Sequence, residues 1–316
     1  MALTEHAPRP DAGLSIAPLS PTIGAEIAGV DLSQPVTGEQ RAALYQALLD
    51  WKVLFFRDQQ ITRAQHVAFA RLFGDLEVHP FAPKAEDFPE VLPIAHNAER
   101  PGHENIWHSD VTWRLEPSLG SVLRCIDCPD LGGDTLFSDM YAAYEGLPTG
   151  IREEIDAMTA IHDFPGFRAR MRERGVSEEE IEEHNKRYPN PEHPVVRTHP
   201  NTGRKALYVN AAFTQCIDGM KEADSQRLLD YLYRQAATPE YQCRFRWSPN
   251  AIAFWDNRSA QHYATSDYWP NERRMERVTI IGDKPFYRPE ETLVDGDSLP
   301  FQGLLKRRRE GLFEHY

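Results

Sequence analysis

Long apolar runs and excess positive charge are both missing from this sequence of 316 residues. No stretch approaches the roughly 18 consecutive apolar residues of a membrane-spanning helix, so we expect no membrane partner. Residues 1–13 contain no apolar h-region typical of a secretory signal, so we expect a cytoplasmic protein. The net charge of −13 argues against a nucleic-acid partner, and it means that an anionic substrate needs specific Arg or His residues to hold it.

Cysteine is scarce as well, with four residues in the chain. Cys125 and Cys128 form a C-x-x-C motif, but no second pair of Cys or His follows at the spacing of a structural zinc site. Pro129 and a glycine-rich turn come next, unlike the strand-to-helix junction of a thioredoxin-like motif. We therefore predict neither zinc nor redox chemistry there. Asn257 begins an N-x-S glycosylation sequon, but we predict no glycosylation there because the sequence shows no secretion signal.

The sequence does contain many short strand-like segments separated by polar turns, mostly in its second half. Capping boxes at Thr37 and Thr62 predict two helices near the amino end, and 222–236 has the pattern of an amphipathic helix. These features predict a mainly β protein with helical insertions, built as an antiparallel sandwich or barrel. Strands are predicted at 53–56, 119–126, 195–199, 206–210, 241–247, 251–256 and 275–282.

The same reading predicts one domain over residues 15–289. Residues 1–14 are expected to be a mobile leader, and residues 290–316 a solvated or interface tail. The segment 168–187 is dense in Arg and then in Glu, which is typical of a solvated helical insertion or a lid.

Three residues in two motifs have the chemistry of a metal site. In an extended strand, His108 and Asp110 of Trp107-His-Ser-Asp would point to the same face. His262 follows an apolar strand much later in the chain. Two His and one carboxylate make the facial triad of non-haem Fe(II) oxygenases, which leaves positions open for a cosubstrate and oxygen. Either motif alone would be common by chance.

Two arginines form a third feature. If 275–282 is a strand, Arg273, Met275 and Arg277 share one face, so two guanidinium groups project into one pocket. Each planar guanidinium can donate two hydrogen bonds to a carboxylate or a sulfonate. A basic patch on a solvated turn is the alternative for this pair taken alone.

Taken together, these motifs resemble the taurine dioxygenase (TauD/TfdA) family of Fe(II)- and 2-oxoglutarate-dependent dioxygenases. The resemblance runs from about residue 15 to about residue 289 and rests on WHSD, WDNRSAQH, RRMERVTIIGDKPFYR, IGAEIAGVDLS, VLFFRDQQIT, GGDTLF and HPVVRTHP. It implies a double-stranded β-helix core, a cupin-like jelly roll of two sheets. It also implies Fe(II) bound by His108, Asp110 and His262, with 2-oxoglutarate and O₂ as cosubstrates and 2-oxoglutarate anchored by Thr135 and Arg273.

The resemblance implies substrate contacts too. The sulfonate-holding positions match His79 and Arg277, and the aromatic wall matches Phe164 and Phe213. Two positions depart from the pattern of the taurine-cleaving members. The substrate-contacting Tyr is Ala82, and the expected Asn is Glu104, although a one-residue slip would put Asn105 there.

We therefore expect a dioxygenase that hydroxylates a small anionic substrate. A sulfonate of the taurine type, with release of sulfite, aldehyde, succinate and CO₂, fits the motifs best. An alkylsulfatase or an aryloxyalkanoate dioxygenase of the same family is the alternative. A metal-free jelly-roll protein that binds an oxyanion is the rival of another class, and its mark would be a lost iron ligand. The family commonly forms homodimers or homotetramers.

Overall fold

The computed structural model describes residues 12–79, 85–102 and 104–289. Most of the expected leader, Ala82 and the expected tail 290–316 lie outside the described residues. No helix in the described ranges is long and apolar enough to cross a membrane.

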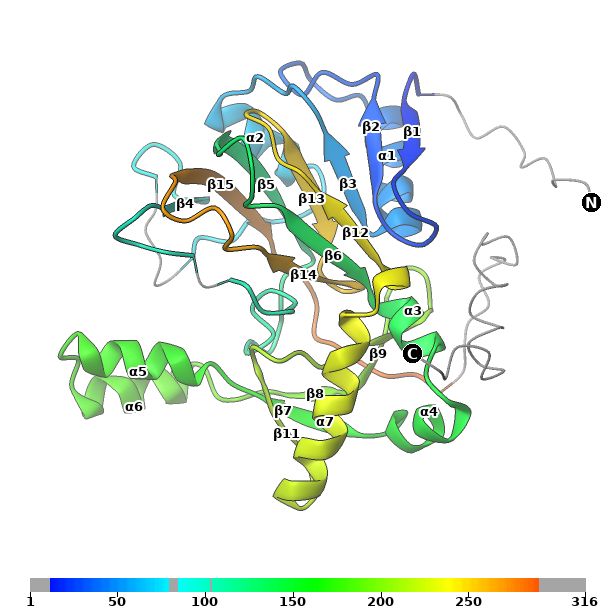
Figure 1. Cartoon of the computed structure of the whole chain (residues 1–316), viewed down its shortest axis with the longest axis vertical. Helices are drawn as coiled ribbons and strands as arrows, with labels where there is room; N and C mark the ends of the chain where they lie inside the picture. The colour runs from blue at the N-terminus through cyan, green and yellow to red at the C-terminus, as the bar shows by residue number, and fades with distance from the viewer. Residues whose placement is uncertain (1–11, 80–84, 103, 290–316) are drawn as a thin grey trace, which may run out of the picture.

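A seven-stranded sheet forms the centre of the structure (Figure 1). Adjacent strands of this sheet run antiparallel, except for the parallel pair β2 and β3. In spatial order the strands are β1 (Ser15–Pro18), β2 (Ala25–Ala28), β3 (Val53–Phe56), β13 (Ile252–Asp256), β5 (Gly120–Asp127), β15 (Arg273–Ile280) and β4 (Val91–His96). Strand β3 begins and ends where the apolar run predicted it.

A second, three-stranded antiparallel sheet has the order β12 (Gln242–Phe245), β6 (Thr135–Asp139) and β14 (Ala260–Ala264). Apolar side chains of both sheets meet in one buried cluster, with Phe55, Leu123 and Met275 from the large sheet and Phe137 and Phe245 from the small one. The two sheets therefore share an interior. Burial of this cluster, at roughly 25 cal/mol per Å² of apolar surface, stabilises the arrangement.

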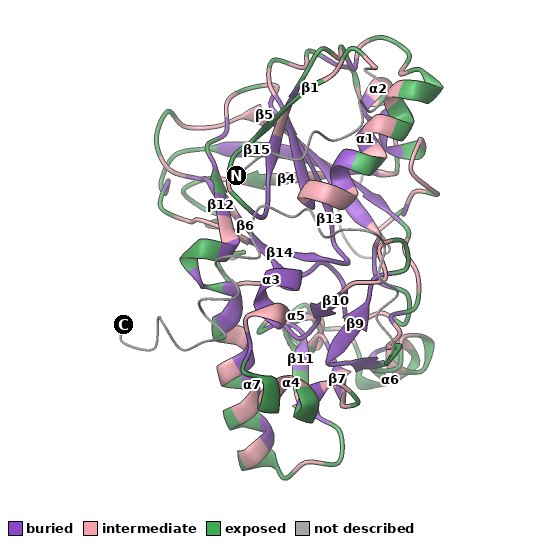
Figure 2. Cartoon of the chain, turned by 90° about the vertical axis from the view of Figure 1, so that its right-hand side faces the viewer, coloured by how far each residue is buried: buried purple, intermediate pink, exposed green. Residues whose placement is uncertain are grey.

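Two helices belong to the apolar cluster on the other side of the large sheet: α1 (Gly38–Trp51) and α2 (Arg63–Arg71). Both begin with the predicted capping boxes, in which the Thr37 and Thr62 hydroxyls accept from the backbone N–H of Gln40 and Gln65. In Figure 2 the central strands of the large sheet, such as β13, are mostly purple, whereas α1 and α2 mix buried residues with exposed and intermediate ones, and the edge strand β1 is green. The two faces of β15 meet different partners, because Met275 belongs to the cluster between the sheets while the buried Glu276 pairs with Arg63 of α2 at 2.7 Å.

The rest of the chain forms a third apolar cluster below the sheets in Figure 1. Helix α7 (Glu222–Ala236) has the predicted bounds. The other elements of this region are β7 (Thr159–His162), β8 (Glu192–Pro194), β9 (Val196–Thr198), β10 (Lys205–Leu207), β11 (Thr214–Ile217), α3 (Met140–Glu145), α4 (Thr149–Ile155) and a 3₁₀ turn at Pro239–Tyr241.

The charged segment 168–187 falls within two helices, α5 (Pro165–Glu173) and α6 (Glu178–Arg187). They form a hairpin that stands out from the body at the left of Figure 1. Both helices are rich in charged residues, and Arg172 pairs with Glu178 at 2.7 Å across the turn between them. The helical part of the prediction is thus observed.

Candidate metal and cosubstrate site

His108 and His262 meet through their backbones. The N–H of His108 donates to the carbonyl of His262 at 3.1 Å, and the reverse bond is 2.8 Å. His262 lies in β14, but His108 makes only this isolated bridge. Asp110 begins a turn, in which Val111 has φ of +49°. The extended strand expected for this motif is therefore wrong: a bridge followed by a turn, and not strand period, brings the two side chains together.

The side chains of His108, Asp110 and His262 form a compact and buried donor set. Their ligand atoms all lie within 4.8 Å of one another. The Oδ1 of Asp110 is 3.8 Å from the Nε2 of His108 and 3.9 Å from that of His262. The Nδ1 of His108 is 2.8 Å from the Ile106 carbonyl, which fixes that nitrogen as the donor and leaves the lone pair on Nε2. This donor set fits a divalent metal, and in the described part of the chain it is the one such group of three.

Burial and neighbouring charges keep Asp110 and His262 in the states that a metal needs. Burial alone would raise the pKa of Asp110, but the charges of Arg277, His262 and His108 outweigh it and lower the pKa to about 2. Burial lowers the pKa of His262 to about 3. At neutral pH the site therefore presents one carboxylate and a neutral imidazole, as a first-row metal requires.

Arg273 lies at the start of β15 and is buried, with 5% of its surface exposed. Its Nε and Nη2 have no hydrogen-bond partner. Its guanidinium carbon is 5.8 Å from the centroid of the Trp247 ring and 5.9 Å from that of Tyr268. A buried guanidinium with open donors is well suited to a carboxylate ligand.

Thr135 begins β6 and is also buried. Its Oγ1 accepts a hydrogen bond from the Trp247 Nε1 at 2.9 Å, which leaves the hydroxyl hydrogen available for a ligand. The loop before it is held in place, because Gly133 donates its N–H to the Asp267 carboxylate at 2.8 Å. Trp247, which no sequence motif indicated, thus lies against both Thr135 and Arg273.

Arg277 follows Arg273 by four residues, two side-chain periods of the strand β15, and its guanidinium reaches the Asp110 carboxylate. Its Nη1 donates to the Asp110 Oδ1 at 3.0 Å, and its Nε is buried without a partner. His79 is half-buried and follows Glu77, whose N–H donates to the carbonyl of Thr279 near the end of β15.

Two aromatic rings line the side of the site near His108. The Phe213 ring is 6.3 Å from the His108 ring, and Phe164 packs edge-on against Phe213 at 5.3 Å. Both belong to a small cluster with Val111 and Trp113. An apolar wall next to the metal-binding residues suits the carbon part of a substrate.

The segment before His108 contains Glu104 and Asn105, the two candidates for the position where the family pattern has an Asn. Glu104 is exposed, and its carboxylate lies 3.6 Å from the Nε2 of His96, while its charge acts on the pKa of Arg273 and of His262. Asn105 is also exposed. Of the two residues, Glu104 is thus the one that acts electrostatically on groups inside the site.

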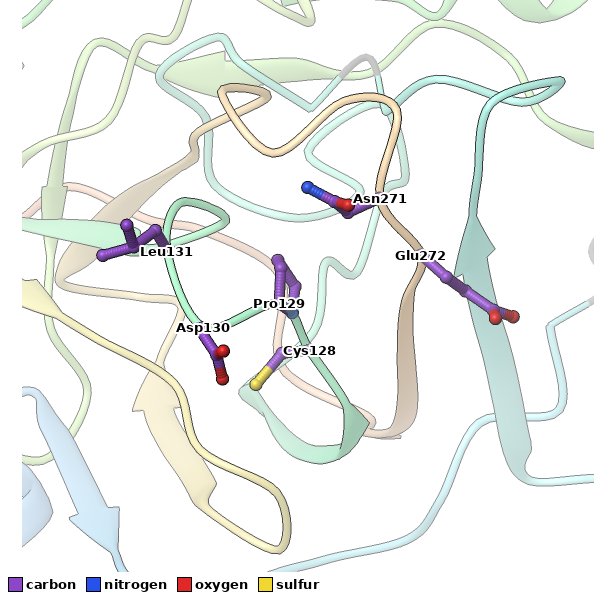
Figure 3. A pocket seen from close by; sticks show the side chains of 6 residues that line it. All are labelled: Cys128, Pro129, Asp130, Leu131, Asn271 and Glu272. Carbon is purple, nitrogen blue, oxygen red and sulfur yellow. The ribbon is translucent and has the colours of Figure 1, made fainter.

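A surface hollow lies where β5 ends and β15 begins (Figure 3). Its lining consists of Cys128, Pro129, Asp130, Leu131, Asn271 and Glu272, none of which is a predicted site residue. Cys125 is buried, and burial raises the pKa of its thiol. All four cysteines are free thiols, and neither Cys125 nor Cys128 joins a cluster of three metal-ligating side chains among the described residues.

Comparison with known proteins agrees with this chemistry. The chain matches the profile of the taurine catabolism dioxygenase TauD, TfdA family over residues 15–279. It is 33% identical over 290 residues to the alkylsulfatase of Acinetobacter baylyi, covering 89% of each chain. It is 35% identical over 277 residues to the alpha-ketoglutarate-dependent sulfate ester dioxygenase of Pseudomonas putida, covering 86% of this chain and 91% of that one.

A solved structure gives the same result. The crystal structure of a taurine dioxygenase from Burkholderia xenovorans has a TM-score of 0.76 and 35% sequence identity, and the match covers 88% of this chain and 92% of the other. Because the match covers 88% of this chain, it supports the overall arrangement and not one motif. With the His-Asp-His donor set in place, the chain belongs to the TauD/TfdA family of Fe(II)- and 2-oxoglutarate-dependent dioxygenases.

Proposed function

We propose that this dioxygenase hydroxylates the carbon next to the sulfur oxyanion of a small sulfonate or sulfate ester. The position of Arg277 carries the proposal, because its guanidinium reaches the Asp110 carboxylate and keeps a buried, unpartnered Nε. A substrate oxyanion bound there would hold its neighbouring carbon close to the metal. His79, two residues after Glu77, whose N–H donates to the Thr279 carbonyl of the same strand, would supply a second donor.

In this proposal His108, Asp110 and His262 hold Fe(II), and Arg273 with Thr135 receives the distal carboxylate of 2-oxoglutarate. The open donors of Arg273 support this role, since a buried guanidinium without a ligand leaves hydrogen bonds unmade. Iron and 2-oxoglutarate, when bound, supply the oxidising power from O₂. The residues of the chain bind and orient the two anions and exclude water.

The reaction balances with one O₂ for each substrate. One oxygen atom enters the C–H bond of the substrate as a hydroxyl group, the other enters succinate, and CO₂ leaves. The hydroxyl group of an α-hydroxysulfonate then loses its proton as the C–S bond breaks, which gives an aldehyde and bisulfite. A hydroxylated sulfate ester gives an aldehyde and hydrogen sulfate in the same way.

The far end of the substrate is expected to differ from that of taurine. Phe164 and Phe213 offer apolar contact near His108. Glu104 stands where an Asn that could hold an amine is expected, but its exposed carboxylate already pairs with His96 at 3.6 Å, and Asn105 is exposed as well, so the ammonium group of taurine has no dedicated partner there. We therefore expect taurine to be a weaker substrate than a longer alkanesulfonate or alkyl sulfate.

We also propose that residues 15–289 form one domain with a double-stranded β-helix core. The shared interior of the seven-stranded and three-stranded sheets supports this, as does the passage of the chain from β13 directly into β14 of the other sheet.

A substrate panel tests the proposal. The purified protein, with Fe(II), 2-oxoglutarate and O₂ held constant, is given taurine, pentanesulfonate, hexyl sulfate or phenoxyacetate. Succinate reports turnover, while sulfite and sulfate report which bond breaks. Faster turnover of either alkyl sulfur compound than of phenoxyacetate supports the proposal. A preference for phenoxyacetate would overturn it and leave the aryloxyalkanoate alternative.

A further inference from the structure

One buried side chain holds both peptide groups of a candidate iron ligand. The Oδ1 of Asn257 accepts from the backbone N–H of Asp110 at 2.6 Å, and its Nδ2 donates to the Asp110 carbonyl at 2.9 Å. The same Nδ2 lies 3.3 Å from the carbonyl of Ser118. Asn257 is 1% exposed, so no solvent competes for these bonds. We infer that Asn257 is a positioning residue, which sets the direction of the Asp110 carboxylate and thereby the metal affinity of the site.

The backbone around Asp110 needs such support. Sheet pairing ends at the isolated bridge of His108, and Asp110 itself begins a turn. Val111, the next residue, has a positive φ, which a β-branched side chain rarely adopts. Without a neighbouring strand, the Asn257 amide takes the place of ladder hydrogen bonds on both sides of the Asp110 Cα.

The carboxylate is held on its other oxygen too. The Oγ of Ser121 lies 3.3 Å from the Asp110 Oδ2, whereas Oδ1 faces the two imidazoles. With the backbone held by Asn257 and Oδ2 by Ser121, the remaining freedom of the side chain is small. A ligand that is already oriented loses less conformational entropy when the metal binds.

Asn257 is itself fixed by the turn between β13 and β14. Its N–H donates to the Leu119 carbonyl at 2.8 Å. On either side of it in sequence, Asp256 and Arg258 form a buried pair at 2.8 Å, and the Asp256 Oδ2 also lies 3.0 Å from the Nε2 of His199. Asp256 and His199 are each 0–1% exposed. This network locks the turn in the one geometry that aims the Asn257 amide at Asp110.

The glycosylation sequon at Asn257 has no bearing on this role, because the amide nitrogen is buried and engaged with two carbonyls. A purely structural role for the turn is the alternative that an experiment must separate. Such a role would lower the thermal stability of the protein and leave its metal affinity unchanged.

The experiment compares Asn257→Ala with Gln261→Ala as a matched control. Gln261 is a buried amide beside His262, but it donates to the Val209 carbonyl and touches no backbone group of a candidate ligand. Co(II) titration under nitrogen, followed by visible absorption, gives the metal affinity, and the melting temperature is measured without metal. We expect Asn257→Ala to bind Co(II) about 10- to 100-fold more weakly than the wild type. Gln261→Ala should keep the wild-type Co(II) affinity, although its melting temperature should be similar to that of Asn257→Ala.

Asn257→Asp keeps the side-chain volume and the acceptor for the Asp110 N–H, but it loses the donor and adds a negative charge. If the donor bond sets the metal affinity, this variant binds Co(II) more weakly than the wild type. If local charge sets it, the variant binds Co(II) as tightly or more tightly, and that result would overturn the inference. Wild-type Co(II) affinity in Asn257→Ala would overturn it equally.

Discussion

The Nη1 of Arg277 lies 3.0 Å from the Oδ1 of Asp110, the same oxygen that faces the Nε2 atoms of His108 and His262. One carboxylate oxygen is therefore shared between the candidate metal position and the cation proposed to hold the substrate. In the proposed site, metal binding and substrate binding are therefore linked through a single atom, and we expect substrate binding to depend on how Asp110 is held.

A first prediction concerns this arginine. Arg277→Ala removes the charge-assisted partner of the substrate oxyanion, which costs about 2 to 5 kcal/mol, so KM for the best sulfur substrate should rise at least about 30-fold. Arg277→Lys should recover part of the loss, since a lysine keeps the charge but not the planar fork. Steady-state kinetics give KM, and a 2-oxoglutarate titration serves as the control, because affinity for the cosubstrate should stay close to that of the wild type. Unchanged KM would remove Arg277 from the substrate site.

The cosubstrate anchor gives a second prediction. Arg273→Ala leaves the distal carboxylate of 2-oxoglutarate without its buried partner, so affinity should fall by about thirty- to several-thousand-fold. Anaerobic titration of the Fe(II) protein with 2-oxoglutarate measures this through the visible charge-transfer band. If Arg277→Ala lowers 2-oxoglutarate affinity more than Arg273→Ala does, the roles of the two arginines are exchanged.

Gly133 tests how closely the loop before Thr135 fits Arg273. Its φ is +72°, and a Cβ there would lie 3.2 Å from the Arg273 Cδ and from the Tyr268 ring. Gly133→Ala should therefore displace Arg273 and weaken 2-oxoglutarate binding. Gly175→Ala is the control, because Gly175 has φ of +77° with open space around it. Both variants should lose about 1–2 kcal/mol of stability from the left-handed backbone. Equal 2-oxoglutarate affinity in the two would show that the contact with Arg273 is without effect.

The metal ligands give a fourth prediction. His108→Ala, His262→Ala and Asp110→Ala each remove one of three donors, so each should abolish turnover and weaken Fe(II) binding. Circular dichroism of the metal-free proteins should stay like that of the wild type, because the backbone bridge between positions 108 and 262 does not use the side chains. A His108→Ala protein that kept a tenth of wild-type turnover would disprove the assignment.

Stability should depend on pH through buried histidines. Burial lowers the pKa of His66 to about 4, and its Nε2 lies 3.0 Å from the Val122 carbonyl. Between about pH 6.5 and 4 the unfolded chain binds a proton that the folded chain does not, so the free energy of unfolding falls as the pH falls, by about 1.4 kcal/mol per pH unit for this residue. His66→Gln keeps a donor for Val122 without titrating. Urea unfolding at several pH values should give a shallower slope for the variant, and equal slopes would contradict the prediction.

The sequence was most informative where local patterns decide the structure. The capping boxes at Thr37 and Thr62, strand β3 and helix α7 follow from short-range chemistry, and the structure confirms them. The family resemblance is confirmed as well. It depended on motifs spread over the chain, and those motifs contain the residues that meet in the site.

The sequence was least informative about contacts between distant segments. The geometry expected around His108 and Asp110 was wrong, because the bridge to His262 forms across more than a hundred residues and no local pattern encodes it. Trp247 and Asn257 were missed for the same reason, since each acts through a partner far away in sequence. A buried amide or indole has no periodicity that could distinguish it from an ordinary core residue.

The pairing of β14 with β6 gives the site one more property. His262 lies opposite Phe137 in this pairing, and side chains alternate between the two faces of a strand. A slip of one residue would turn His262 to the opposite face of the small sheet and bring Gln261 or Tyr263 inward. A chain that paired these strands one residue out of register would therefore bind metal poorly, so the metal affinity of the site depends on the β14–β6 register as well as on its three ligands.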